Sequence, residues 1–294
     1  MTHHYHGGPI WGDKEISYHE LMPALWRNGG ALISYAYPQQ LKNVVNIPCK
    51  LVLDCGAYTT WNSDKRKHAS RNWEEHWQGY YDKMVAPWFS RIEWFLIPDV
   101  IEGTEEENDR LLQTVPGWLK SKAVPVWHSD ESIERFIRLC EEYPLVAIGC
   151  CGPHRRIRSA AWLARMQEVF TAIYIDRDLP VKIHGLRMLD GRVLSMFPFD
   201  SADSSSVATN VPKTEKVIPE EPCKLKRTAI LRAAKELITP PTVKQWRSTF
   251  AKIDEPLYDT LRNAGIGHNE TLRLCGYDRQ INLSSPARCG TFSF

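Results

Sequence analysis

Short apolar runs alternate with amphipathic stretches along most of the chain. Between Ile133 and Cys140, for example, apolar residues recur at helical spacing, and Thr104 and Glu107 have the spacing of a capping box that begins a helix. Alternation of strands with helices predicts an α/β fold, a parallel (β/α)8 barrel of the TIM type with a C-terminal helical extension. The predicted strands cover residues 4–10, 31–36, 51–54, 94–99, 124–128, 145–149, 181–184 and 199–203.

The region after the last predicted strand differs in composition from the body of the chain. Pro212, Pro219 and Pro222 stand among mixed charges there, as in a linker, and helical patterns follow at 225–238 and 243–253. We therefore predict a barrel over residues 1–210, a linker over 211–224 and a basic helical extension over 225–294.

Charge is distributed unevenly between these parts. Residues 224–294 carry 12 Lys and Arg against 6 Asp and Glu, whereas residues 1–223 carry 25 against 29. Such asymmetry is typical of a segment that faces a polyanion. A solvated helical face would have the same composition, so charge alone leaves both interpretations open.

Length and composition exclude some classes of protein. The chain has 294 residues, 43% of them hydrophobic, which suffices for one barrel with an appendage or for two smaller domains. No apolar run reaches the roughly 18 residues of a membrane span, and the polar, His-rich start is unlike a signal peptide. The 8 cysteines are scattered without a C-x-x-C pair. We expect a cytoplasmic protein.

Two aspartates follow predicted strands at positions that favour catalysis. In a parallel barrel all strand carboxyl ends share one mouth, so Asp54 and Asp203 are expected there together. A carboxylate such as Asp203 can attack an anomeric carbon, and a second one can transfer protons. Local sequence also fits simpler roles, a helix N-cap for Asp203 and a turn before glycine for Asp54.

Other strand ends offer groups that could hold a ligand. Asp99 could accept hydrogen bonds from a purine, His128 could bind a base or a metal, and Gly149 would expose backbone N–H groups. The arginines at positions 155, 156 and 158 could hold phosphates, or they could form a solvated basic loop.

Six short segments in a fixed order resemble the tRNA-guanine transglycosylases, and most closely their smaller phage relatives, which insert 7-deazaguanines into DNA. The resemblance covers roughly residues 5–210. The segments that carry it are Asp54-Cys55-Gly56-Ala57-Tyr58, Pro98-Asp99, Pro125-Val126-Trp127-His128, Ile148-Gly149-Cys150-Cys151-Gly152, His184-Gly185 and Ser201-Ala202-Asp203-Ser204-Ser205-Ser206.

The resemblance implies a (β/α)8 barrel and base exchange through a covalent aspartyl-glycosyl intermediate. Asp203 would attack C1′ as guanine leaves, and Asp54 would assist proton transfer. No redox cofactor and no metal are implied. A flipped nucleotide would be the substrate. The implied base-binding residues are Asp99, His128, Gly149, Cys150, His184 and Gly185, and the implied phosphate-binding residues are Arg155, Arg156 and Arg158.

The chain departs from the tRNA enzymes in two ways. His128 stands where they carry a glutamine, and their C-x-C-x-x-C…H zinc site has no counterpart, since Cys223, Cys275 and Cys289 are widely spaced. We expect the basic extension to replace the tRNA-contacting part, which favours DNA over tRNA as the partner, with a 7-deazaguanine base as co-substrate.

Three other functions fit the same residues. Water could attack the glycosyl intermediate, which would make the protein a base-excising DNA glycosylase. A metal-dependent barrel hydrolase could use His4, His6, His128, His184 and Asp203 as ligands. A DNA-binding protein on an inactive barrel would need none of this chemistry. The sequence predicts no oligomeric state.

Overall fold

The computed structural model describes residues 3–7, 26–27, 29–67, 71–206, 208 and 239–277. Its strands are all parallel, and neighbours in the sheet follow the order β5-β4-β3-β2-β1-β9-β8-β7-β6. The strands are β1 (His3–His6), β2 (Gly30–Ser34), β3 (Lys50–Asp54), β4 (Trp94–Leu96), β5 (Ala123–Val124), β6 (Val126–His128), β7 (Leu145–Gly149), β8 (Lys182–Gly185) and β9 (Ser201–Ser204).

The two end strands of this order, β5 and β6, are halves of one strand interrupted at Pro125. The first half pairs with β4 and the second with β7, and the Pro125 carbonyl accepts a hydrogen bond from Ala147 N–H. Proline has no N–H to donate, so the ladder is interrupted there without a break in the chain. The sheet thus closes into the predicted (β/α)8 barrel.

Side chains that alternate along the strands fill the barrel. Tyr5, Leu32, Val52, Trp94 and Ala147 belong to one buried interior cluster. Gly30 makes room for the ring of Tyr5, because a Cβ there would lie 2.5 Å from that ring. Two residues beyond this interior layer, the same face of β2 and β3 presents Ser34 and Asp54 at the barrel mouth.

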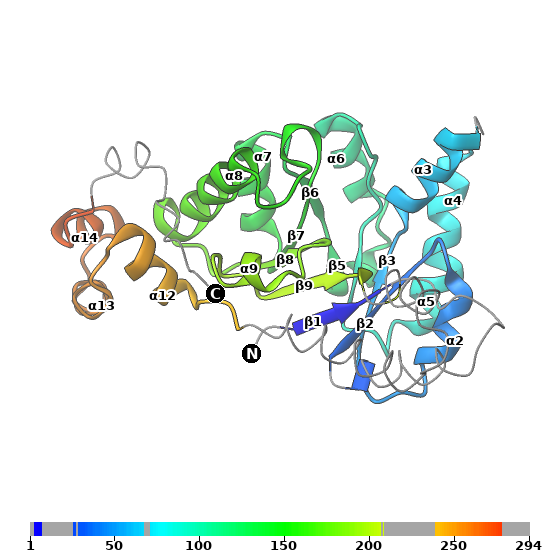
Figure 1. Cartoon of the computed structure of the whole chain (residues 1–294), viewed down its shortest axis with the longest axis horizontal. Coiled ribbons are helices and arrows are strands. Elements are labelled where there is room, and N and C mark those ends of the chain that lie inside the picture. The colour runs from blue at the N-terminus through cyan, green and yellow to red at the C-terminus, as the bar shows by residue number, and fades with distance from the viewer. Residues whose placement is uncertain are drawn as a thin grey trace, which may run out of the picture.

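Helices surround the barrel, as Figure 1 shows, and their apolar faces form a second, larger core against the outer face of the strands. Thr104 and Glu107 make the predicted capping box. The helices are α2 (Leu41–Val44), α3 (Ala57–Lys67), α4 (Trp73–Tyr80), α5 (Ala86–Trp88), α6 (Glu105–Gln113), α7 (Ile133–Glu142), α8 (Ala160–Thr171), α9 (Gly191–Leu194), α12 (Val243–Trp246), α13 (Glu255–Asn263) and α14 (His268–Leu274), with π-helical turns η2 (Tyr81–Val85), η5 (Ala172–Asp176) and η6 (Arg247–Ala251) and 3-10 turns η1 (Pro38–Gln40), η3 (Gly117–Lys122) and η4 (Gly152–His154).

The C-terminal helices α12–α14 project from one side of the barrel (Figure 1). They dock at η5 through Arg247, which donates to the Tyr174 carbonyl at 3.4 Å and to Asp178 at 3.1 Å. A buried ion pair with Glu255 of the extension holds Arg247 in place. Because η5 leads toward the start of β8, this contact lies away from the strand carboxyl ends. The predicted linker over 211–224 and the predicted helix over 225–238 fall outside the described residues.

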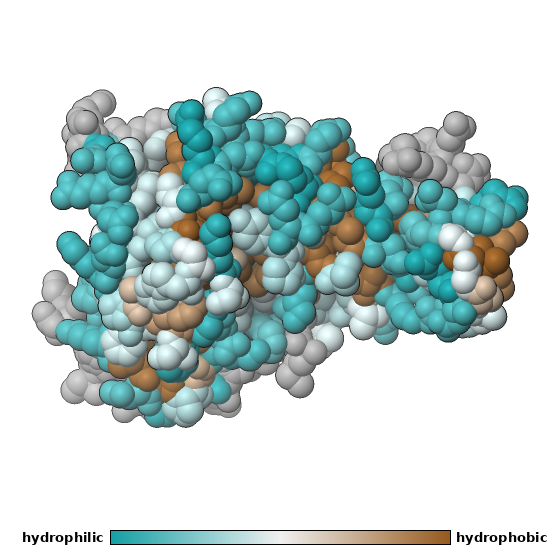
Figure 2. Space-filling view, turned by 180° about the vertical axis from the view of Figure 1, so that it is seen from behind, coloured by the Kyte–Doolittle hydropathy of each residue, from teal (hydrophilic) through white to brown (hydrophobic). Residues whose placement is uncertain are grey.

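Polar side chains cover most of the face shown in Figure 2, where apolar residues show through between the helices and on the projecting extension. Leu257 in α13 and Leu274 in α14 are exposed. None of the helices in the described ranges is long and apolar enough to cross a membrane.

Candidate functional site at the barrel mouth

A cavity of about 180 Å³ opens at the carboxyl ends of the strands. It is smaller than the several hundred Å³ of typical drug-sized sites, so it suits a compact ligand. Residues from β2, β3, β9 and the segment after β8 contribute to its wall. The polar lining includes Ser34, Gln40, Asp54, Thr59, Arg187 and Asp203. The two aspartates predicted to work together therefore line one cavity.

Asp54 ends β3 and faces the cavity with part of its carboxylate. Its Oδ1 accepts a hydrogen bond from Gly56 N–H at 3.1 Å, and Gly56 has a φ of +76°, which favours glycine. Asp54 thus makes the predicted turn before glycine and also lines the site. Burial raises the pKa of Asp54 to about 6, although hydrogen bonds with Gly56 and Ser34 act in the opposite direction.

Asp203 is held from two sides at the end of β9. Its Oδ1 accepts a hydrogen bond from the backbone N–H of Arg187 at 2.8 Å, and His184 Nε2 lies 3.4 Å from the same oxygen. The other ring nitrogen of His184 contacts Ser201 Oγ at 2.8 Å. Among the described contacts, the Asp203 side chain accepts its hydrogen bond from the loop after β8 and caps no helix. Asp203 also lines the cavity.

A second polar cluster lies next to Asp54 and includes its neighbour Cys55. Cys55 Sγ donates to Asp99 Oδ1 at 3.3 Å, and His128 Nε2 lies 2.9 Å from Asp99 Oδ2. Gly149 packs against the His128 ring, since a Cβ there would lie 3.1 Å from His128 Cδ2. Three of the predicted base-binding residues are thus gathered in one place, although none of them lines the cavity.

The opposite side of His128 is also occupied by a carboxylate. Glu131 Oε2 accepts from the backbone N–H of His128 at 2.9 Å, and Glu131 Oε1 lies 3.6 Å from the ring Nδ1. Arg135 and Asn108 also donate to Glu131. Burial alone would lower the pKa of His128, but hydrogen bonds and charges from Asp99 and Glu131 outweigh it and raise the pKa to about 10. His128 is therefore a buried imidazolium between two carboxylates, which fits neither metal binding nor an idle polar side chain.

Three predicted base-binding residues lie elsewhere. His184 is fully buried beneath Asp203, against the rings of Trp94 and Tyr5. Gly185 faces the outer core, where a Cβ would meet Met188 at 2.8 Å. Cys150 accepts a hydrogen bond from Trp162 Nε1 at 3.1 Å. None of these three residues lines the cavity, because strand alternation and burial direct them elsewhere, and their base-binding role stays a prediction.

The three arginines predicted to bind phosphate lie on the loop between β7 and α8. Arg155, Arg156 and Arg158 are exposed, and Arg158 Nε lies 3.5 Å from Asp190 on the neighbouring loop. None of them lines the cavity. Their place is on the rim outside it, so a phosphate at the cavity itself must be held by something else.

Sequence reasoning missed several residues of the cavity. Ser34 ends the observed strand β2 but lies inside the predicted strand 31–36, and Arg187 lies two residues after the end of β8. Closer attention to strand ends and to the residues just after them would have found both. Gln40 is buried on η1 and carries no such signal, since it approaches the cavity only through the fold of the β2–β3 connection.

The alternative metal site is not assembled. His4 and His6 alternate along β1 with Tyr5, whose ring fills the barrel, so both imidazoles face the outer side. Burial lowers the pKa of His6 to about 4, with a smaller contribution from His4. Within the described ranges, no group of three or more His, Cys, Asp or Glu side chains has the arrangement of a metal site.

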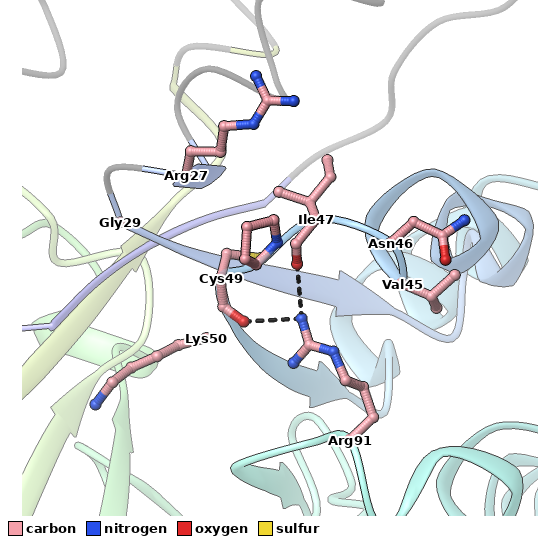
Figure 3. Close-up of a pocket in the computed structure, with 9 residues that line it drawn as sticks. Arg27, Gly29, Val45, Asn46, Ile47, Cys49, Lys50 and Arg91 are labelled. Atoms are coloured by element: carbon pink, nitrogen blue, oxygen red, sulfur yellow. Dashed lines mark hydrogen bonds between the residues drawn. The ribbon is translucent and has the colours of Figure 1, made fainter.

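A larger hollow lies at the opposite end of the barrel (Figure 3). It measures about 850 Å³ and includes the cations Arg27, Lys50 and Arg91. These side chains do not converge: Arg91 donates to the carbonyls of Ile47 and Cys49 at 2.9 and 2.8 Å, while Lys50 and Arg27 point away from it (Figure 3). This end of a TIM barrel contributes to stability.

No family model and no curated protein matches the chain. Among solved structures it is similar to the tryptophan synthase alpha-subunit of Pyrococcus furiosus. Two mutant forms of that subunit give TM-scores of 0.43 and 0.42 at 12% identity, and each alignment covers 80% of this chain and 96% of the other. A third structure gives 0.41. Similarity at this level carries no information about substrate or reaction.

Proposed function

We propose that the chain is a pentosyltransferase that exchanges guanine in DNA for a 7-deazaguanine base. The observation that carries the proposal is that Asp54 and Asp203, which lie 149 positions apart in sequence, line one small cavity at the barrel mouth. Their surroundings differ, which is the usual condition for two carboxylates with different roles.

Asp203 is the nucleophile in this proposal. Its carboxylate forms a bond to C1′ of the target nucleoside while the C1′–N9 bond breaks and its electron pair leaves with guanine. The hydrogen bond from Arg187 N–H fixes one carboxylate oxygen and leaves the other for attack. Exchange is completed when the incoming base attacks C1′ and the carboxylate leaves.

Asp54 transfers the proton. A carboxyl with a pKa of about 6 can be neutral or ionised near neutral pH, so it can protonate the departing guanine and then accept the N9 proton of the incoming 7-deazaguanine. Each proton given up in the first half of the reaction is thereby regained in the second. The protein needs no external acid for the cycle.

The cluster next to Asp54 supports recognition of a purine edge. The ion pair with His128 orients the carboxylate of Asp99, and Cys55 connects this group to the strand end that carries Asp54. A carboxylate in this position would accept the N1–H and 2-amino hydrogens of a guanine-like base. For Asp99 to recognise the base, the base must extend past Asp54 into this cluster.

The test is mass spectrometry of nucleosides from plasmid DNA of cells that express the chain together with a 7-deazaguanine pathway. We expect a 7-deazaguanine nucleoside, its loss by at least about 10³-fold with Asp203→Asn, and wild-type levels with the exposed control Asp82→Asn. Abasic sites in place of a modified nucleoside would identify a glycosylase. Modified RNA with unmodified DNA would refute the choice of DNA.

A further inference from the structure

Arg187 reaches across the mouth of the barrel from the loop after β8. Its guanidinium carbon lies 3.8 Å from the centre of the Tyr58 ring, on the helix that follows β3. Arg187 also lines the cavity, and Tyr58 is 44% exposed. The stacked pair therefore connects the β8 side of the mouth with the β3 side, next to Asp203 and Asp54.

This guanidinium differs from two other arginines near the mouth, which form ion pairs. Arg158 and Arg192 both lie 3.5 Å from the carboxylate of Asp190, whereas Arg187 has no carboxylate within ion-pair distance among the residues that the structure describes. Its resting contact is a cation–π stack, which is weak at an exposed site. A planar guanidinium presents a fork of donors that matches a phosphate group.

The backbone of Arg187 links this cation to the reaction centre. Its N–H holds Asp203 Oδ1 at 2.8 Å, and its φ of +59° is in the left-handed region that few non-glycine residues adopt. Such a conformation persists where the surrounding structure fixes it, often at functional sites. A group bound by the Arg187 side chain is thus held at a set position relative to Asp203.

We infer that Arg187 binds a phosphate of the nucleotide whose base is exchanged. The inference rests on the proposed function and assigns to Arg187 the phosphate-binding role that the resemblance implied for Arg155, Arg156 and Arg158. The phosphate draws the guanidinium from the Tyr58 ring, and the sugar is then placed with C1′ toward Asp203. The rim arginines lie farther out, where they can contact only flanking nucleotides.

The test compares Arg187→Gln with Arg177→Gln, which removes the same charge near the opposite end of the barrel. Glutamine at position 187 keeps the N–H that holds Asp203, and Arg187→Lys retains the charge without the fork. Binding of a short single-stranded oligodeoxynucleotide that contains one guanine is measured by fluorescence anisotropy over a series of KCl concentrations. Thermal unfolding checks that each variant is folded.

We expect Arg187→Gln to weaken binding about tenfold and to reduce the slope of log Kd against log salt by about 1, as loss of one phosphate contact does. Arg177→Gln should leave both unchanged, and Arg187→Lys should restore the slope. In exchange assays the Arg187→Gln variant should raise KM more than it lowers kcat.

Two results would overturn the inference, and they are distinguishable. If the wild-type chain exchanges guanine but Arg187→Gln binds with the wild-type slope and KM, the phosphate site is wrong and the proposed function stands. If the wild-type chain neither binds the oligonucleotide nor exchanges its guanine, the proposed function fails and the phosphate assignment fails with it.

Discussion

Replacing Asp54 by asparagine should make the protein more stable at alkaline pH. The pKa of this carboxyl rises from 3.8 to about 6 in the folded chain, chiefly because of burial. At 1.36 kcal/mol per pKa unit, ionisation in the folded state costs about 3 kcal/mol of unfolding free energy. The carboxylate is partly open to the cavity, so solvent screening reduces the expected cost to about 1–2 kcal/mol.

Whether stability rises or falls with pH depends on whether the folded or the unfolded chain binds the Asp54 proton more tightly. Between about pH 4 and pH 6 the folded state retains the Asp54 proton and the unfolded chain loses it, so wild-type stability falls as pH rises. Asp54→Asn is free of this loss and keeps an oxygen that can accept from Gly56 N–H. The stability gained by the variant should therefore be near zero at pH 4 and reach its full value by pH 8.

Urea unfolding at several pH values measures the difference directly, and thermal unfolding should show a rise in Tm of about 2–5 °C at pH 8. The same variant should lose base exchange, because the amide cannot transfer the proton. Asp82→Asn, on an exposed helical surface, controls for the substitution itself. Equal stability of Asp54→Asn and wild type at pH 8 would show that burial does not perturb this carboxyl as described.

Three further substitutions test contacts that stabilise the barrel and its C-terminal extension. Replacing His128 by Asn leaves two buried carboxylates without their cation and should cost about 3–5 kcal/mol below pH 6.5; this loss should shrink steadily between pH 6.5 and about pH 10, because over that range the folded chain retains the His128 proton and the unfolded chain has lost it. Arg247→Met should cost a similar amount in urea unfolding and expose α12–α14 to limited proteolysis, since it breaks the pair with Glu255; proteolysis at the wild-type rate would contradict this. Gly30→Ala should cost about 1–3 kcal/mol by overpacking, and adding Tyr5→Leu should recover part of it.

The strand pattern was readable from sequence because barrel strands are short, apolar and separated by amphipathic helices. Each of the eight predicted strands corresponds to an observed one, with the 124–128 strand divided at Pro125. The predicted and observed strands differ in their end residues, because burial and hydrogen bonding in the folded barrel decide where each strand ends. The predicted helix over 243–253 is observed as α12 continued by the π-helical turn η6.

The candidate site was readable only in part. Strand ends identify which residues reach the mouth, and this placed Asp54 and Asp203 on one cavity. Sequence does not say which way a strand-end side chain turns, so His184 and Gly185 were expected in the cavity although one fills the barrel and the other faces the outer core. Nor does it reveal which partners surround a strand-end residue, such as Asp99 and Glu131 around His128.

The charge of the C-terminal extension needs a different interpretation from the one its composition suggests. Residues 239–277 hold five Lys and Arg against four Asp and Glu, so the excess of positive charge lies in residues outside the described range. Lys244, Arg247 and Arg273 form ion pairs with Asp or Glu of the extension itself. Cations already paired in this way have little capacity to attract phosphates.

The docking site of the extension leads to the same conclusion. Because α12–α14 pack on η5, away from the strand carboxyl ends, a nucleotide at the cavity of Asp54 and Asp203 meets the loops of the mouth instead. Recognition by these loops predicts that Lys244→Gln leaves the salt dependence of oligonucleotide binding unchanged, whereas Arg156→Gln on the rim reduces its slope. The reverse result would mean that the helices α12–α14, and not the rim of the barrel, carry the nucleic-acid contact.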